Sequence, residues 1–123
     1  MNEAFALTDI LLQPVVEGEA TAPPTEPAAG ATYIVASPAT GLFEGREACL
    51  ASWQQGQWIF VNPINGMCVF DANASAKRRF GDDWSLPALI ANPEGGTTID
   101  TEARATIAAI LACLRQSGDL PSS

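Results

Sequence analysis

One pattern repeats between residues 31 and 86 and constrains the fold more than any other feature. Short runs rich in β-branched and aromatic residues alternate with stretches of Gly, Pro, Asn or Asp. The runs read ATYIVAS, ACLASW, QWIFV, MCVFD, AKRRF and WSL. Such runs joined by tight turns are typical of antiparallel strands. No helical pattern lies between them, so we expect a small antiparallel meander or barrel, and not a parallel sheet.

Both ends of the chain carry helical patterns. Residues 2–13 combine a broad apolar surface with an N-terminal Asn-Glu pair, and Pro14 stops the pattern. Residues 100–116 form the clearest helix, with Asp100 as its cap and Gly118 after its end. The expected fold class is therefore α+β and mainly β.

Two segments have the composition of linkers. Residues 16–30 hold three prolines and three glutamates without a basic residue, so we expect them to be extended and exposed. A second linker contains Pro93 and the Gly95-Gly96 pair. The expected organisation is an N-terminal helix (1–15), a Pro-rich linker (16–30), an antiparallel β domain (31–90), a Gly/Pro linker (91–98) and a C-terminal bundle helix (99–118).

Charge and composition exclude several classes of function. The 14 acidic residues outnumber the six basic ones, giving a net charge of −8, whereas binding to nucleic acid requires Lys and Arg. The longest apolar run, residues 107–114, is too short to cross a bilayer, so we expect no membrane insertion. Three widely spaced cysteines, Cys49, Cys68 and Cys113, indicate reduced thiols in a protein made in a cytosol.

The sequence offers little for catalysis. It contains no histidine, which removes the usual nucleophilic triads and the commonest metal ligand. Gly95-Gly96 lacks the residues that follow in a phosphate-binding loop. Carboxylates at turns could supply a glycosidase pair, but the simpler interpretation is that they solvate turns and strand ends. We expect no catalytic residue, no metal and no cofactor.

The aromatic residues allow two interpretations. Trp53 and Trp58 flank the turn QQGQ, where they could pair across a hairpin and fill a core, or present a surface on which sugar rings stack. Trp58 is in phase with Phe60, so we expect Trp58 in the core and Trp53 at the surface. Trp53, Trp84 and Tyr33 are the candidate glycan-binding residues.

The run KRR, residues 77–79, holds half of the positive charge of the chain. In a strand, Lys77 and Arg79 point one way and Arg78 the other. The run is either a solvated face or a docking patch for an acidic neighbouring subunit or an anionic glycan.

The C-terminal helix carries a seam typical of helical bundles. Ala103, Ile107, Ile110 and Leu114 are spaced by four, three and four residues, and Leu111 widens the apolar face. Either this face packs on the β domain of its own chain, or it joins copies of the chain. Isoleucine at both seam positions favours a bundle of more than two helices. We therefore expect a homo-oligomer, with a trimer favoured and a pentamer as the alternative.

Residues 2 to about 86 resemble, as an ordered series, a domain family found in phage tail and fibre proteins and in gene transfer agents of alphaproteobacteria. The series comprises the entry helix NEAFALTDILLQPVV, the linker and strand APPTEPAAGATYIV, the central stretch ATGLFEGREACLASWQQGQWIFVNPINGMCVFD and the closing RRFGDDW. The C-terminal DTEARATIAAILACLRQSGDL is similar to the terminal helix of phage head and tail fibre proteins, which associates around a symmetry axis.

This resemblance implies a structural or attachment subunit of a phage-like particle, such as a head spike or fibre component, and not an enzyme. It implies a location in a virion-like particle after synthesis in a bacterial cytoplasm. The implied partners are further copies, other spike, fibre or capsid proteins and host capsule polysaccharide. Two alternatives remain open at this point: a capsule-degrading or modifying enzyme, and an adaptor that carries another fibre protein without binding glycan.

Overall fold

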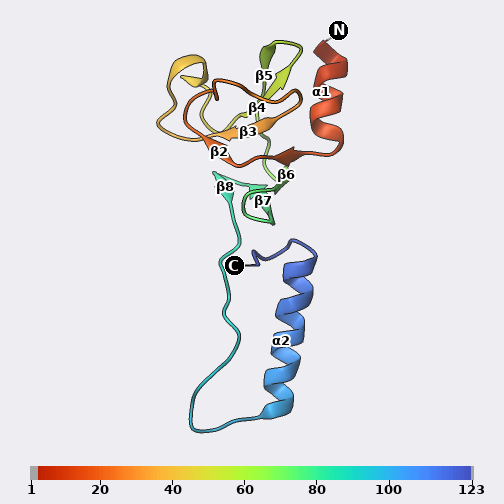
Figure 1. Cartoon of the computed structure of the whole chain (residues 1–123), viewed down its shortest axis with the longest axis vertical. Coiled ribbons are helices and arrows are strands. Elements are labelled where there is room, and N and C mark those ends of the chain that lie inside the picture. The colour runs from red at the N-terminus through yellow and green to blue at the C-terminus, as the bar shows by residue number, and fades with distance from the viewer. Residues whose placement is uncertain (1–2, 123) are drawn as a thin grey trace.

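The computed structural model describes residues 3–122 and consists of two four-stranded sheets with a helix at each end (Figure 1). Helix α1 (Glu3–Leu12) begins the chain, α2 (Thr101–Gln116) closes it, and a single 3-10 turn, η1 (Gly41–Phe43), lies between β3 and β4. The strands are β1 (Val15–Val16), β2 (Glu19–Ala20), β3 (Thr32–Val35), β4 (Leu50–Gln54), β5 (Gln57–Val61), β6 (Cys68–Asp71), β7 (Ala76–Phe80) and β8 (Trp84–Ser85).

Each sheet contains an antiparallel meander with one short parallel strand added at its edge. The first sheet has the order β1-β6-β7-β8 and the second the order β2-β3-β4-β5. Strands β3 to β5 and β6 to β8 pair antiparallel, whereas β1 pairs parallel with β6, and β2 with β3. The expected mainly β, α+β class is confirmed. Over residues 3–122 the two sheets stay separate and form no closed barrel.

The expectation of an exposed linker over residues 16–30 is wrong in part for residues 16–20, where Val16 and Gly18 are buried although Glu17 and Glu19 are exposed. Val16 is fully buried, and β1 and β2 extend the two sheets from within this segment. Gly18 lies between them with φ of +133°, a conformation that glycine adopts readily, and this allows the chain to step from one sheet to the other. Residues 15–20 therefore connect the two meanders, because β1 pairs with β6 and β2 pairs with β3.

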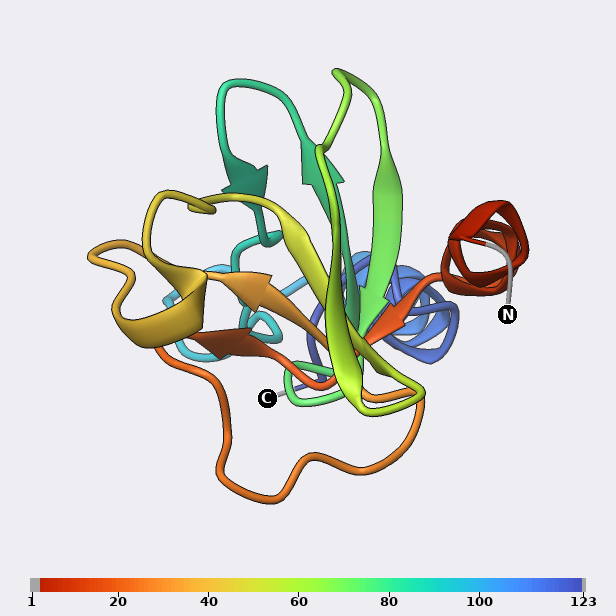
Figure 2. The ribbon, with the colours of Figure 1, turned by 90° about the horizontal axis from the view of Figure 1, so that it is seen from above.

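The two faces of the second sheet pack into different clusters. On one face, Ile34, Leu50 and Val61 join Val16 and Val69 in the main core, which lies between the sheets. The opposite face belongs to a smaller cluster formed by Val35, Ala39, Phe43 and Ala51. Alternation along the strands separates these sets, because successive side chains point to opposite faces. Viewed from above (Figure 2), α1 lies at one side of the sheets.

Helix α2 stands apart from both sheets and is tied to the rest of the chain at its two ends (Figure 1). Asp100 caps its N-terminus by accepting a 2.9 Å hydrogen bond from the Ala103 N–H, as predicted. Arg104 donates to the Gly95 carbonyl, and Arg115 donates to the side chain of Asn92, both in the preceding linker. Neither helix within residues 3–122 has the length and hydropathy needed to span a membrane.

After α2 the chain returns to the first sheet. The Lys77 N–H donates a 2.6 Å hydrogen bond to the Gly118 carbonyl, and the Lys77 ammonium lies 3.1 Å from Asp119. Gly118 also packs close to the ring of Phe70 on β6. Gly118 and Asp119 thus attach the C-terminal end of α2 to Lys77 of β7, and we call this attachment the C-terminal latch.

Candidate functional site

Trp53 and Trp58 face each other directly across the hairpin of β4 and β5. They are register partners, and their ring centroids lie 5.2 Å apart. Of the two interpretations that the sequence left open, the cross-strand contact is therefore present. Such pairs stabilise small sheets.

Trp58 is the centre of a larger set of rings, which we call the aromatic row: Tyr33, Phe43, Trp53, Trp58 and Phe60. Phe43 meets Trp58 edge to face at 5.0 Å, and Tyr33 meets it at 6.2 Å. Trp53, Trp58 and Tyr33 are all half-buried. The expected difference between a core Trp58 and a surface Trp53 is smaller than predicted, because both rings are half-buried, although Trp58 packs against the buried cluster around Phe43 and Trp53 is not part of that packing.

Trp84, the third candidate for glycan binding, is a core residue. Its side chain is 6% exposed, and its indole Nε1 donates a 2.7 Å hydrogen bond to the Ala48 carbonyl. Phe80 packs beside it at 5.2 Å. A ring that is buried with its polar atom satisfied has no face free for a sugar, so the prediction for Trp84 is wrong.

The basic run of β7 does not form a common patch. Arg78 is directed inward, where its side chain is 12% exposed and pairs with Asp71 and Glu19. Lys77 pairs with Asp119 of the C-terminal latch. Arg79 alone of the three shows no charged partner within the described part of the chain. The candidate docking patch is therefore corrected to one free cation, because the other two bind segments of the same chain.

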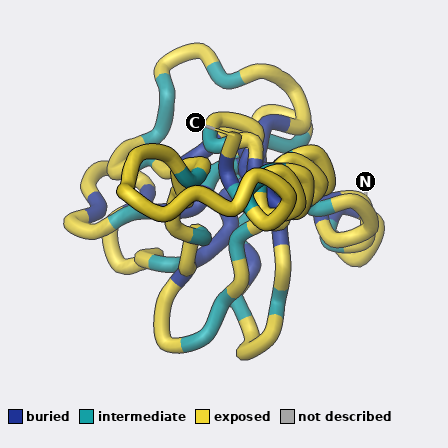
Figure 3. The backbone as a smooth tube through the Cα atoms, turned by 90° about the horizontal axis from the view of Figure 1, so that it is seen from below, coloured by how far each residue is buried: buried dark blue, intermediate teal, exposed yellow. Residues whose placement is uncertain are grey.

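Helix α2 presents most of its predicted seam to solvent, and the burial colours show it exposed along most of its length (Figure 3). Ile107 and Ile110 are 46% and 54% exposed, Ala103 is exposed and Leu114 is half-buried. Leu111 differs, because it is 5% exposed within its own chain. Leu111 is therefore removed from the candidate interface.

The helical period explains the difference. Residues 104, 108, 111 and 115 share one face, on which Arg104 and Arg115 hydrogen bond to the linker. Leu111 lies among them. Ala103, Ile107, Ile110 and Leu114 occupy the adjacent face, which we call the isoleucine face.

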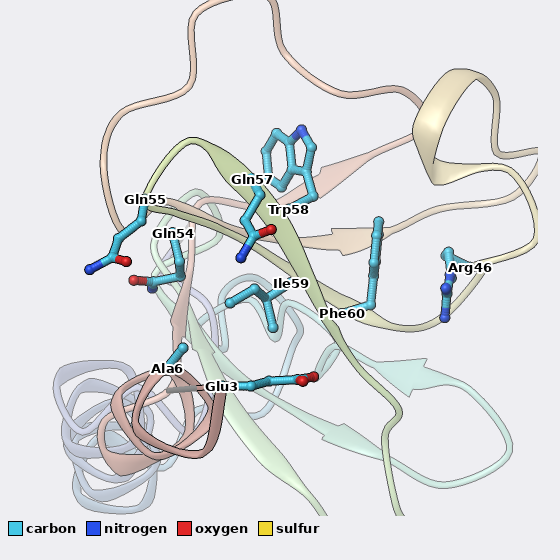
Figure 4. Close-up of a pocket in the computed structure, with 9 residues that line it drawn as sticks. All are labelled: Glu3, Ala6, Arg46, Gln54, Gln55, Gln57, Trp58, Ile59 and Phe60. Atoms are coloured by element: carbon cyan, nitrogen blue, oxygen red, sulfur yellow. The ribbon is translucent and has the colours of Figure 1, made fainter. Parts of the chain in front are cut away.

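A groove runs between α1 and the free edge of β5 (Figure 4). The sequence did not predict it. Its volume is about 360 Å³. It is lined by Glu3, Ala6, Arg46, Gln54, Gln55, Gln57, Trp58, Ile59 and Phe60. The sequence carried one signal of it, the three glutamines around the Gly56 turn, but the groove exists only because α1 lies against β5.

The three cysteines are free thiols, as predicted. Cys49 is buried and donates a hydrogen bond to the side chain of Asn62 at 3.2 Å, whereas Cys68 and Cys113 are exposed. Burial raises the pKa of the Cys49 thiol above its ordinary value, partly offset by the nearby Arg46. Over residues 3–122 no group of three or more Cys, Asp or Glu side chains has the arrangement of a metal site.

The fold and these surfaces define a small two-sheet β domain followed by a latched helix. The chain belongs to a family described as "Protein of unknown function (DUF2793)", which matches residues 1–85. The match ends at the last residue of β8, so it covers α1 and both sheets and leaves α2 outside. No curated protein and no solved structure is significantly similar to the chain.

Proposed function

We propose that this protein is a structural subunit of an attachment appendage on a phage-like particle, such as the head spike or fibre of a gene transfer agent. In this role the β domain contacts neighbouring proteins and contributes to binding of host capsule polysaccharide. Helix α2 joins copies of the chain. The protein is made in a bacterial cytoplasm and acts in the assembled particle.

The isoleucine face of α2 is the observation that carries this proposal. Ile107 and Ile110 lie about half exposed on a helix that stands away from the sheets. Contiguous exposed apolar residues mark contact surfaces in soluble proteins. Leu89, Ile90 and Ile99, in the segment between β8 and α2, are also exposed, which adds apolar area near the helix.

The attachment of α2 favours a second copy as its partner. The linker hydrogen bonds through Arg104 and Arg115 and the latch at Lys77 fix the helix on one side. The isoleucine face lies beside these contacts, and they leave Ile107 and Ile110 exposed. Its spacing is that of a bundle seam. Isoleucine at both seam positions favours a bundle of three helices, with a pentamer as the alternative on a five-fold vertex.

Imaging of labelled particles tests the location. An epitope tag after residue 123, detected with gold-conjugated antibody by electron microscopy, is expected at appendages of phage-like particles from a producing strain. Label confined to the cell lysate, with particles unlabelled, would contradict the proposal.

The enzyme alternative predicts a different result with purified capsule. Incubation with the chain, followed by size analysis of the sugar, is expected to release no oligosaccharide if the role is structural. Release of oligosaccharide would favour a capsule-degrading enzyme. Retention on the particle together with no binding to capsule would favour the adaptor alternative.

A further inference from the structure

The outer edge of β5 carries backbone groups that pair with no strand of residues 3–122. Trp53 directs its backbone towards β3, because its N–H donates to Ala31 at 2.9 Å and its carbonyl accepts from Gly30 at 2.8 Å. Its register partner Trp58 is therefore in a non-hydrogen-bonded pair, and the N–H and carbonyl of Trp58 point away from β4. Phe60, two residues on, has the same orientation. Since β5 is the last strand of its sheet, these groups lie along its free edge, and both residues line the groove beside α1.

The side chains of the groove add both donors and acceptors. Gln54, Gln55 and Gln57 each carry an amide, which offers two donor hydrogens and an acceptor oxygen. The Gln54 Nε2 donates to the Ser52 hydroxyl at 3.0 Å, which fixes this side chain and leaves its oxygen as an acceptor. These amides gather at one end of the groove (Figure 4).

The two charged residues of the groove balance each other. Arg46 is positioned by its stacking 4.8 Å above the ring of Phe60, and Glu3 reaches the groove from the first turn of α1. One cation and one anion give the groove no net charge. A strongly charged ligand would therefore be repelled by one of them as it is attracted by the other.

A neutral, hydroxyl-rich ligand matches this lining. Each hydroxyl group both donates and accepts, as the amides and the backbone groups of Trp58 and Phe60 require. The volume of about 360 Å³ lies near the lower end of ligand pockets, which span roughly 300–1,000 Å³. It thus suits a few sugar units at a time.

We infer that the β5-edge groove binds a short stretch of neutral polysaccharide, an assignment that rests on the proposed attachment function and gives it a site. An added peptide strand is the competing occupant of a free sheet edge. It would use the backbone of Trp58 and Phe60 but would leave the glutamine amides, Glu3 and Arg46 without partners. A saccharide can hydrogen bond both to the backbone groups of β5 and to the polar side chains of the groove.

The test titrates the full-length chain, labelled with ¹⁵N, with neutral oligosaccharides of glucose, galactose, mannose, rhamnose and N-acetylglucosamine. We expect at least one of them to shift the backbone amide signals of Trp58 and Phe60. Gln57→Ala is expected to raise its Kd roughly tenfold, through loss of hydrogen bonds to the sugar. Gln116→Ala, an exposed glutamine at the C-terminal end of α2 and not part of the groove lining, is the matched control and is expected to bind as the wild type does.

Three results would overturn the assignment. The first is binding that Trp53→Ala abolishes and Gln57→Ala leaves unchanged, which would move the glycan to the aromatic row and keep the attachment function. The second is protection of the Trp58 and Phe60 amides by an extended peptide and by no sugar. The third is that no member of the panel binds, and sedimentation of the same samples then shows whether the assembly role survives.

Discussion

Arg78 donates a 2.6 Å hydrogen bond from Nε to Oδ2 of Asp71, a carboxylate with no exposed surface. The same guanidinium lies 3.3 Å from Glu19, so a residue of β7 in the first sheet reaches β2 in the second. Asp71 also accepts a hydrogen bond from the Ala74 N–H, which closes the turn between β6 and β7. Arg78 therefore links the first sheet to the second through Glu19, and Asp71 links Arg78 to the turn that follows β6.

Arg78→Met should destabilise the protein strongly. It leaves the Asp71 carboxylate buried without its cation, and breaking such a pair from one side costs about 3–5 kcal/mol. Urea unfolding followed by circular dichroism measures the loss in the free energy of unfolding. Arg79→Met, on the exposed side of the same strand, should change it by less than about 0.5 kcal/mol.

Adding Asp71→Asn to the Arg78→Met variant tests whether the unpaired charge of Asp71 causes the loss of stability. The neutral amide removes the uncompensated charge, so part of the lost stability should return. Equal stability of the Arg78→Met and Arg79→Met variants would contradict the buried role of Arg78.

Trp84→Ala should lower the free energy of unfolding more than Trp53→Ala does. Trp84 fills the main core and its indole N–H is satisfied by Ala48, so truncation should cost about 3–5 kcal/mol. Trp53 is half-buried and pairs with Trp58, so its truncation should cost about 1 kcal/mol. Chemical denaturation of both variants gives the comparison, and a larger loss for Trp53→Ala would contradict the assignment of Trp84 to the core.

The thiols should separate into two classes of reactivity. In the folded protein at pH 8, iodoacetamide should label Cys68 and Cys113 rapidly and Cys49 slowly. Cys49 is buried, and its raised pKa lowers the fraction of reactive thiolate. Mass spectrometry should find three labels after unfolding without reductant. Rapid labelling of all three in the folded protein would contradict the burial of Cys49, and fewer than three labels after unfolding would indicate a disulfide.

The C-terminal latch should open in acid. The hydroxyl of Ser117 and then Lys77 hold the pKa of Asp119 below its ordinary value of 3.8. A carboxylate with a lowered folded-state pKa stabilises the fold above the unfolded pKa, and this contribution is lost as the pH falls through the folded pKa. Protection of the Lys77 amide, which donates to Gly118, should therefore fall below about pH 4.

Asp119→Asn is the control for the latch. It lacks the titrating group, so the protection of its Lys77 amide should show no step in this pH range. Wild-type protection that stays constant to pH 2 would contradict a latch that depends on Asp119.

Local chemistry explains which elements the sequence predicted well. The run from Thr32 to Val35 is rich in β-branched residues, and the cap at Asp100 acts on the turn that follows it directly. These signals depend only on near neighbours. They therefore identified six of the eight strands and both helices close to their observed bounds.

The remaining features depend on partners that are distant in the sequence. β1 and β2 are two residues each and acquire their structure only by pairing with β6 and β3. The burial of Trp84 depends on the Ala48 carbonyl, which is presented at a residue with φ of +69°. The groove likewise requires α1 beside β5. None of these relationships leaves a periodic pattern in the chain.

Sedimentation velocity of the full-length chain at micromolar concentration tests the central claim, that the isoleucine face joins copies of this protein. We expect the wild type to sediment as an oligomer, with a trimer favoured. Ile107→Asp combined with Ile110→Asp should yield smaller species while the circular dichroism of the sheets is retained, because charges replace the exposed apolar contacts. Ala105→Asp combined with Ala112→Asp, on the opposite side of α2, is the matched control and should assemble as the wild type does. A wild-type chain that sediments as a monomer would contradict the claim.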